Sequence, residues 1–164
     1  GQASFANKDI EKIFGLLSAE LYKTKTEAST LLSKELGNCY TASLYAGLAS
    51  LIFNEGKQLA GKRLGLFSYG SGSASTFFEA RGVETTNANS PFSLEKMQSV
   101  LNLNHRLNDR VKVDPETYEA IIDGNVNRYH KCDFKSESPI ENIAPGTYYL
   151  ESIDSLWRRT YHRK

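Results

Sequence analysis

A continuous run of apolar and small residues over 42–53 limits most strongly what this chain can fold into. It reads ASLYAGLASLIF, and no charged side chain interrupts it. A helix that is apolar around its whole circumference is a buried helix, and the following Gly56 is a typical helix stop. We therefore predict a helix over 42–54 with both faces buried, including Leu44, Leu48 and Leu51, in a layered structure.

The segments on either side of this run indicate a mixed α/β protein. Apolar residues spaced three and four apart predict an amphipathic helix over 8–23. The segment 27–38 is predicted as either a strand or an irregular connection. Alternation predicts a strand over Leu64–Ser68 and a second strand over about 74–81, which would form a hairpin or a neighbouring pair.

Two capping residues predict where helices begin in the second half of the chain. Ser93 is predicted to cap one helix, and Asp114 with Pro115 at the first helical position is predicted to begin another. The last stretch, 146–164, is rich in aromatic and β-prone residues and predicts one or two closing strands.

Composition bounds the class of protein. The chain has 164 residues, 40% of them hydrophobic, and a formal net charge of +1. We expect a single domain over 1–164 and neither a nucleic-acid nor a membrane partner. Cys39 and Cys132 have no metal-ligand spacing and are too few for a disulfide framework, so we expect a reducing compartment and no metal. No signal peptide or membrane-spanning run is expected.

Polar residues gather at the start of the apolar helix. Asn38 directly precedes it, and Tyr40, Thr41 and Ser43 fall in its first turn. Free N–H groups and the helix dipole lie there, and an asparagine side chain offers both a donor and an acceptor. These residues therefore predict either a binding site or a simple helix cap formed by Asn38 or Thr41.

A second polar motif follows the first predicted strand. Gly70, Ser71 and Gly72 end it abruptly. Glycine allows positive φ and the close approach of a ligand, so the motif predicts either a tight turn or a binding loop.

The two motifs together resemble the C-terminal region of the 3-hydroxy-3-methylglutaryl-CoA (HMG-CoA) synthase family, of the eukaryotic type. The similarity lies in GNCYTASLYAGLASLI, LAGKRLGLFSYGSGSASTFFEARG, GTYYL and SIDSLWRRTYHRK, and is weakest from Val83 to Val113. The resemblance implies an α/β, thiolase-like fold. This chain would be its C-terminal half, a mixed β-sheet with helices on both faces and a buried helix after the Gly-Asn-x-Tyr-Thr motif.

The resemblance also implies a function. The family condenses acetyl-CoA with acetoacetyl-CoA to HMG-CoA in the mevalonate pathway of isoprenoid and sterol biosynthesis. No cofactor is implied beyond these two CoA substrates. The implied substrate-binding residues are Asn38, Tyr40, Tyr69, Gly70, Ser71 and Gly72.

By the same resemblance, no catalytic residue is expected in this chain. The family's cysteine nucleophile, its glutamate acid/base and its histidine all lie upstream of the matching region. Cys39 occupies the variable position of its motif and is expected to be a small buried hydrophobe, while the basic end 157–164 could contact CoA phosphates or form a solvated strand end. The remaining residues without a matching role are His105, His130, His162, Glu79, Glu84, Glu119 and Cys132.

The expected partners follow from what the chain lacks. The resemblance implies acyl-CoA substrates, the upstream half of the synthase in cis or in trans, and a homodimer. The implied location is the cytoplasm, with the mitochondrion left open, and the chain by itself is expected to be inactive. The alternative is a non-catalytic module derived from a thiolase-like half, which binds CoA esters or mediates dimerisation.

Overall fold

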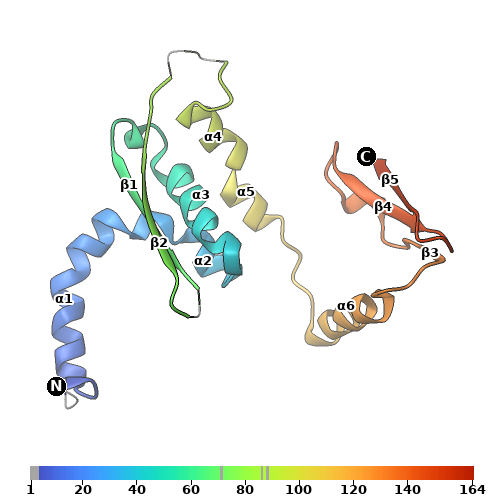
Figure 1. Ribbon diagram of the computed structural model, residues 1–164, viewed down its shortest axis with the longest axis horizontal. Helices are drawn as coiled ribbons and strands as arrows, with labels where there is room; N and C mark the ends of the chain where they lie inside the picture. The colour runs from blue at the N-terminus through green and yellow to red at the C-terminus, as the bar shows by residue number, and fades with distance from the viewer. Residues whose placement is uncertain (1–3, 71, 86, 88) are drawn as a thin grey trace. The chain divides into compact units, whose positions relative to one another are not determined.

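The computed structural model describes residues 4–70, 72–85, 87 and 89–164 (Figure 1). The chain divides into two units, Gly1–Arg110 and Val111–Lys164, which are described separately. The expectation of a single domain over 1–164 stays a prediction. Among the described residues, no helix combines the length and the apolar character that crossing a membrane requires.

The first unit opens with the predicted amphipathic helix. Helix α1 spans Lys8–Lys25, and the Asn7 side chain caps it by accepting hydrogen bonds from the N–H groups of Asp9 and Ile10. Its apolar face is not covered by this chain, since Phe14 is 66% and Leu17 72% exposed. The helix is therefore confirmed, and the described residues of this chain leave its apolar face exposed.

The segment that follows α1 is helical. A 3₁₀ turn, η2 (Glu27–Ser29), leads into the short helix α2 (Leu31–Leu36). The strand alternative for 27–38 is wrong. The physical reason is tertiary, because the N–H of Leu32 donates to the hydroxyl of Ser50, which lies on a different helix.

The apolar run forms helix α3 (Ser43–Glu55), between the 3₁₀ turns η3 (Tyr40–Ala42) and η4 (Gly56–Leu59). Gly56 ends the helix as predicted, with φ +49° and its N–H bonded to the carbonyl of Ile52. The predicted burial of both faces is met only in part by this chain alone. Leu44, Leu48 and Leu51 are half-buried, because one side of α3 borders an open cavity.

The two predicted strands pair as an antiparallel hairpin. Strand β1 (Arg63–Tyr69) lies in register with β2 (Ser75–Arg81), from Arg63 opposite Arg81 to Tyr69 opposite Ser75. The hairpin lies beside α3, and Leu66 of β1 is buried. The named strands of the described chain form antiparallel ladders, so the mixed sheet implied by the family is not completed by these residues. A two-stranded ribbon leaves both of its edges open.

Two short helices complete the first unit. Ser93 caps α4 (Leu94–Leu101) by accepting from the N–H of Lys96, as predicted, and α5 (Leu103–Asn108) follows. The buried hydrophobic side chains come from η4, β1, α4 and α5, and they are Leu59, Leu66, Leu94 and Leu103. The core of this unit is thus small for its length.

The second unit contains one helix and one sheet. Asp114 caps α6 (Pro115–Arg128) by accepting from the N–H of Thr117, and Pro115 stands in its first turn, as predicted. After β3 (Phe134–Lys135) and the 3₁₀ turn η5 (Ile140–Asn142) come β4 (Tyr148–Ile153) and β5 (Arg159–Arg163). These strands form an antiparallel sheet in the order β3-β4-β5. β4 and β5 confirm the predicted closing strands, and β3 lies outside the stretch predicted to form them.

Candidate functional site

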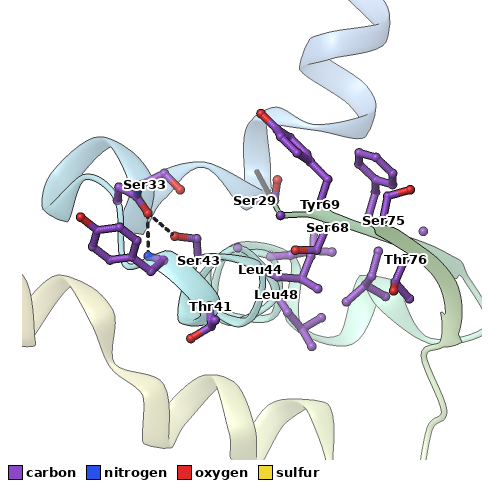
Figure 2. A pocket seen from close by; sticks show the side chains of 18 of the residues that line it. Ser29, Ser33, Thr41, Ser43, Leu44, Leu48, Ser68, Tyr69, Ser75 and Thr76 are labelled. Carbon is purple, nitrogen blue, oxygen red and sulfur yellow. Dashed lines mark hydrogen bonds between the residues drawn. The ribbon is translucent and has the colours of Figure 1, made fainter. Parts of the chain in front are cut away.

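A cavity of about 1100 Å³ lies within the first unit. It is bordered by η2 and α2, by the start of α3, and by the end of the β1–β2 hairpin. Figure 2 shows Leu44 and Leu48 of α3 facing the strands that carry Ser68 and Thr76. The cavity therefore has an apolar floor and a rim of hydroxyl groups. Its hydroxyl-bearing residues are Ser29, Thr30, Ser33, Tyr40, Thr41, Ser43, Ser68, Tyr69, Ser75 and Thr76.

Asn38 lines this cavity and shapes the chain that enters α3. Its side-chain oxygen Oδ1 accepts the backbone N–H of Tyr40 at 2.6 Å and the hydroxyl of Ser43 at 3.3 Å. This is an Asx-type turn, in which a short polar side chain replaces a backbone acceptor. Thr41 makes no such bond, and the residue at the N-cap position of α3 is Ala42. Of the two predicted caps, only Asn38 binds the entering backbone.

The hydrogen bonds fix which way the Asn38 carboxamide faces. A backbone N–H can only donate, so the atom 2.6 Å from the Tyr40 nitrogen must be the oxygen of the amide. The amide nitrogen Nδ2 is then left with two donors, and it bonds to no other residue in the described part of the chain. Asn38 thus presents a hydrogen-bond donor at the edge of the cavity.

The backbone around Asn38 is strained. Gly37 has φ +75° and Tyr40 has φ +51°, and the second value is uncommon for a residue that carries a Cβ. Strain of this kind persists where the surroundings hold it, and it gathers at binding sites. Tyr40 lines the cavity, and its side chain is 84% exposed.

The end of the hairpin supplies the opposite wall. Tyr69 and Gly70 line the cavity, and the N–H of Gly70 donates to the carbonyl of Ala74 at 3.2 Å to begin the connection between the strands. Gly70 thus begins the hairpin connection and borders the cavity. Ser71 lies outside the described residues. Gly72, with φ +149°, is not among the residues that line the cavity.

The structure thus brings four of the six expected binding residues, Asn38, Tyr40, Tyr69 and Gly70, to one cavity. Sequence reasoning did not assign to the site the hydroxyls of Ser29, Thr30 and Ser33. They reach the cavity because η2 and α2 pack against α3. A signal was present, because Thr26, Ser29, Thr30 and Ser33 are spaced three and four apart, as on one face of a helix. It pointed to no site while the segment was predicted as a strand or an irregular connection.

The cysteines and histidines have other surroundings. Cys39 is half-buried, and among the described residues its thiol hydrogen-bonds to the carbonyl of Gly37, at 3.8 Å. In the described chain, no hydrogen bond joins either cysteine to a histidine or a carboxylate. His105 pairs with Asp109 at 2.7 Å and His162 with Glu151 at 2.8 Å. Within the same described residues, no group of three or more metal-ligating side chains is gathered.

Comparison with known proteins gives a consistent family. The family model described as hydroxymethylglutaryl-coenzyme A synthase C terminal matches residues 1–164. The mitochondrial hydroxymethylglutaryl-CoA synthase of Sus scrofa is 44% identical over 162 residues, which cover 98% of this chain and 32% of the pig protein. The cytoplasmic enzyme of Rattus norvegicus is 37% identical over 163 residues. These cover 98% of this chain and 31% of the rat protein.

A solved structure agrees with the sequence relatives. MvaS in complex with 3-hydroxy-3-methylglutaryl coenzyme A is 30% identical, with a TM-score of 0.64. The match covers 87% of this chain and 30% of MvaS, and it confirms the α/β, thiolase-like fold class. The chain spans about a third of the length of the curated relatives it matches. It therefore belongs to the hydroxymethylglutaryl-CoA synthase family, and it corresponds to the C-terminal part of those enzymes.

Proposed function

We propose that this chain forms one wall of the acyl-CoA pocket of a synthase that condenses acetyl-CoA with acetoacetyl-CoA to HMG-CoA. One observation carries the proposal: Asn38 lines the same cavity as Tyr69 and Gly70 at the end of the hairpin. These two motifs are far apart in the sequence, and no hydrogen bond joins them among the described residues. The match to the family over residues 1–164 favours this function over a non-catalytic binding or dimerisation module.

The role proposed for Asn38 is to donate a hydrogen bond to an acyl oxygen. In the condensation, the α-carbon of an acetyl thioester loses a proton to a base outside this chain and attacks the ketone carbon of acetoacetyl-CoA, whose oxygen then takes up a proton. Negative charge develops on the carbonyl oxygens during these steps. Donors that are already aimed at such an oxygen stabilise the transition state. The Nδ2 group suits this role, because the Oδ1 atom is occupied by Tyr40 and Ser43.

The nucleophile is proposed to come from residues outside this chain, in cis or in trans. Acyl transfer to a cysteine needs a thiolate that a neighbouring base or cation activates. Neither Cys39 nor Cys132 has a hydrogen bond to such a group among the described residues, and Cys39 contacts a carbonyl oxygen instead. The proposed partners are therefore acyl-CoA substrates, the upstream part of the synthase, and a second copy in a homodimer.

The pathway and the compartment also belong to the proposal. The relatives include mitochondrial and cytoplasmic enzymes, at 44% and 37% identity. We propose a place in the mevalonate pathway, with a cytoplasmic location, and the mitochondrial location is the competing outcome. No cofactor is proposed. Binding of CoA phosphates by the basic end stays a prediction, and there Arg158 and Arg163 already bond to Asp154 and to the Gly146 carbonyl.

The experiment changes Asn38 in the full-length synthase that carries this segment. Asn38→Ala should lower the condensation rate by about 10²–10³-fold. Asn38→Asp keeps the oxygen that accepts the Tyr40 N–H but removes the donor, so it should lose a similar factor in rate while keeping its thermal midpoint. Loss of a cap alone would cost about 1 kcal/mol of stability and leave the rate unchanged. That second pattern would contradict the proposed role.

A companion measurement uses the chain by itself. Incubation with labelled acetyl-CoA followed by intact-mass analysis should show no acyl adduct, since neither cysteine bonds to an activating base or cation among the described residues. A stoichiometric adduct on Cys39 or Cys132 would overturn the proposal that the nucleophile lies elsewhere.

A further inference from the structure

We propose that Ser43 is a positioning residue, which holds the Asn38 carboxamide so that its Nδ2 donor faces the reacting acyl group. The inference rests on the proposed function, because it needs Asn38 to donate to the substrate. It adds a residue whose contribution acts through Asn38.

The Ser43 hydroxyl lies between two parts of the turn that enters α3. It accepts the backbone N–H of Cys39 at 2.9 Å and donates to Oδ1 of Asn38 at 3.3 Å. Figure 2 shows the bond to Asn38 as a dashed line that ends on Ser43. Ser43 is the first residue of α3, with helical φ −59° and ψ −38°, so the rigid end of the helix sets the position of the hydroxyl.

The Ser43 hydroxyl accepts one of these bonds and donates the other, and together they hold the Asn38 carboxamide in place. Since its oxygen accepts the Cys39 N–H, the hydroxyl proton is free to point toward Asn38. Oδ1 of Asn38 then has two donors, Tyr40 N–H and the Ser43 hydroxyl. The Tyr40 N–H can only donate, so it keeps Oδ1 rather than Nδ2 turned toward the backbone. The Ser43 hydroxyl adds a second bond to the same oxygen, and so restricts the motion of a carboxamide whose Nδ2 is available.

Without the Ser43 hydroxyl, the turn that carries Asn38 loses two hydrogen bonds. The Cys39 N–H loses its acceptor, and only the Tyr40 N–H still holds Oδ1. Asn38 is exposed, so water can replace the lost partner and the carboxamide can move. Misplacement of a reacting or stabilising group by a small distance lowers the rate strongly while leaving ground-state binding largely intact.

The same helix offers a matched control. Ser50 also lies on α3, is fully buried, donates to the Ala46 carbonyl at 2.8 Å and accepts the Leu32 N–H at 3.1 Å. It is not among the residues that line the cavity. Ser50→Ala removes a hydroxyl that ties two helices together, so it should lower the thermal midpoint and leave kcat unchanged.

The test measures kcat, KM and the thermal midpoint of variants of the full-length synthase. Ser43→Ala should lower kcat by about 10- to 100-fold with little change in KM for acetoacetyl-CoA, as for other groups that act by orienting a functional side chain. Ser43→Thr keeps a hydroxyl and should stay within about threefold of the parent enzyme. In an Asn38→Ala background, Ser43→Ala should add no further loss in kcat, since its target is gone.

Each contrary result has a distinct meaning. If Asn38→Ala leaves kcat unchanged, the proposed function of Asn38 fails, and the role of Ser43 fails with it. If Asn38→Ala is slow but Ser43→Ala only lowers the midpoint, as Ser50→Ala does, the positioning role alone is overturned. An equal loss in Ser43→Ala and Ser43→Thr, or a further loss in the Asn38→Ala background, would also overturn it.

Discussion

At the scale of single residues, Asn38 shows how a capping residue and a binding residue can be the same side chain. Its oxygen accepts the Tyr40 N–H and so holds a backbone with positive φ, while its nitrogen is left for another partner. An asparagine can do both because its amide carries an acceptor and two donors. The sequence left open whether Asn38 is a cap or a binding residue. Both descriptions can hold, because the cap uses Oδ1 and the binding role uses Nδ2.

Gly82 is a second residue whose identity the surroundings dictate. It follows β2, accepts the Gly61 N–H at 2.8 Å and donates to the Lys62 carbonyl at 3.0 Å. A Cβ at this position would clash with the backbone carbonyl oxygen of Leu59, a buried residue of the core. Backbone cannot move aside as a flexible side chain can.

We therefore expect Gly82→Ala to destabilise the first unit by about 1–3 kcal/mol, the usual range for overpacking. Thermal unfolding followed by circular dichroism measures the effect. Gly15→Ala is the matched control, because nothing lies within 4 Å of a Cβ there and Gly15 is exposed on α1. That variant should be slightly stabilised, by about 0.5–1 kcal/mol. Equal midpoints for the two variants would contradict the clash.

At the scale of elements, local signals predicted most helices and strands correctly. The caps at Ser93 and Asp114, the stop at Gly56 and the alternation in β1 all act through neighbours in the sequence. Helix α2 was not predicted, because a distant contact helps to hold it: its Leu32 N–H bonds to Ser50, eighteen positions away. Contacts of that kind leave no local pattern to read.

The candidate site divides in the same way. Asn38 and Gly70 could be predicted because each belongs to a motif beside a recognisable element. The hydroxyls of Ser29 and Ser33 were missed, because their helical spacing indicates a shared face but only the packing of η2 and α2 on α3 brings that face to the cavity. Tyr40 was expected at the site, but its positive φ has no signal in its residue type.

The cap of α6 leads to a prediction about pH. Hydrogen bonds from the backbone N–H and the side chain of Thr117 hold the pKa of Asp114 below its ordinary value of 3.8. The folded state therefore favours the carboxylate. The resulting stabilisation is fully present above the ordinary value and is lost as the pH falls through the lower, folded value.

Asp114→Asn separates this charge from the hydrogen bond, because asparagine caps a helix well but does not titrate. We expect the parent chain to have the higher midpoint at neutral pH and to lose that advantage in acid. Thermal unfolding from about pH 2 to about pH 7 measures the difference. Asp154, whose pKa is lowered mainly by bonds from Arg158, is present in both proteins and cancels in the comparison. A difference that stays constant over this range would contradict the prediction.

At the scale of the whole molecule, much apolar surface is left uncovered. On α1, Phe14, Leu17 and Leu21 are 66%, 72% and 61% exposed, and Phe77 on the hairpin is 72% exposed. Soluble monomers rarely expose contiguous apolar patches of more than a few hundred Å². In the proposed function, the rest of the synthase covers such surface.

We therefore expect the isolated chain to self-associate and to bind a dye that reports apolar surface. Leu17→Lys should shift the sedimentation coefficient toward that of the monomer, because it places a charge in the middle of the apolar face. Ala19→Lys adds the same charge on the side of α1 opposite Leu17, where the chain is exposed, and should leave association unchanged. If the parent chain is monomeric and binds no dye, the proposal that another part of the synthase packs on this apolar surface is contradicted.

The pairing of β1 with the very next strand also has a consequence for the order of events during folding. The hairpin closes through a short connection, and α3 packs against α2, which directly precedes it. Contacts between near neighbours form quickly, and a hairpin takes about 1–10 μs. The walls of the cavity are therefore expected to assemble early in folding, from contacts within this chain.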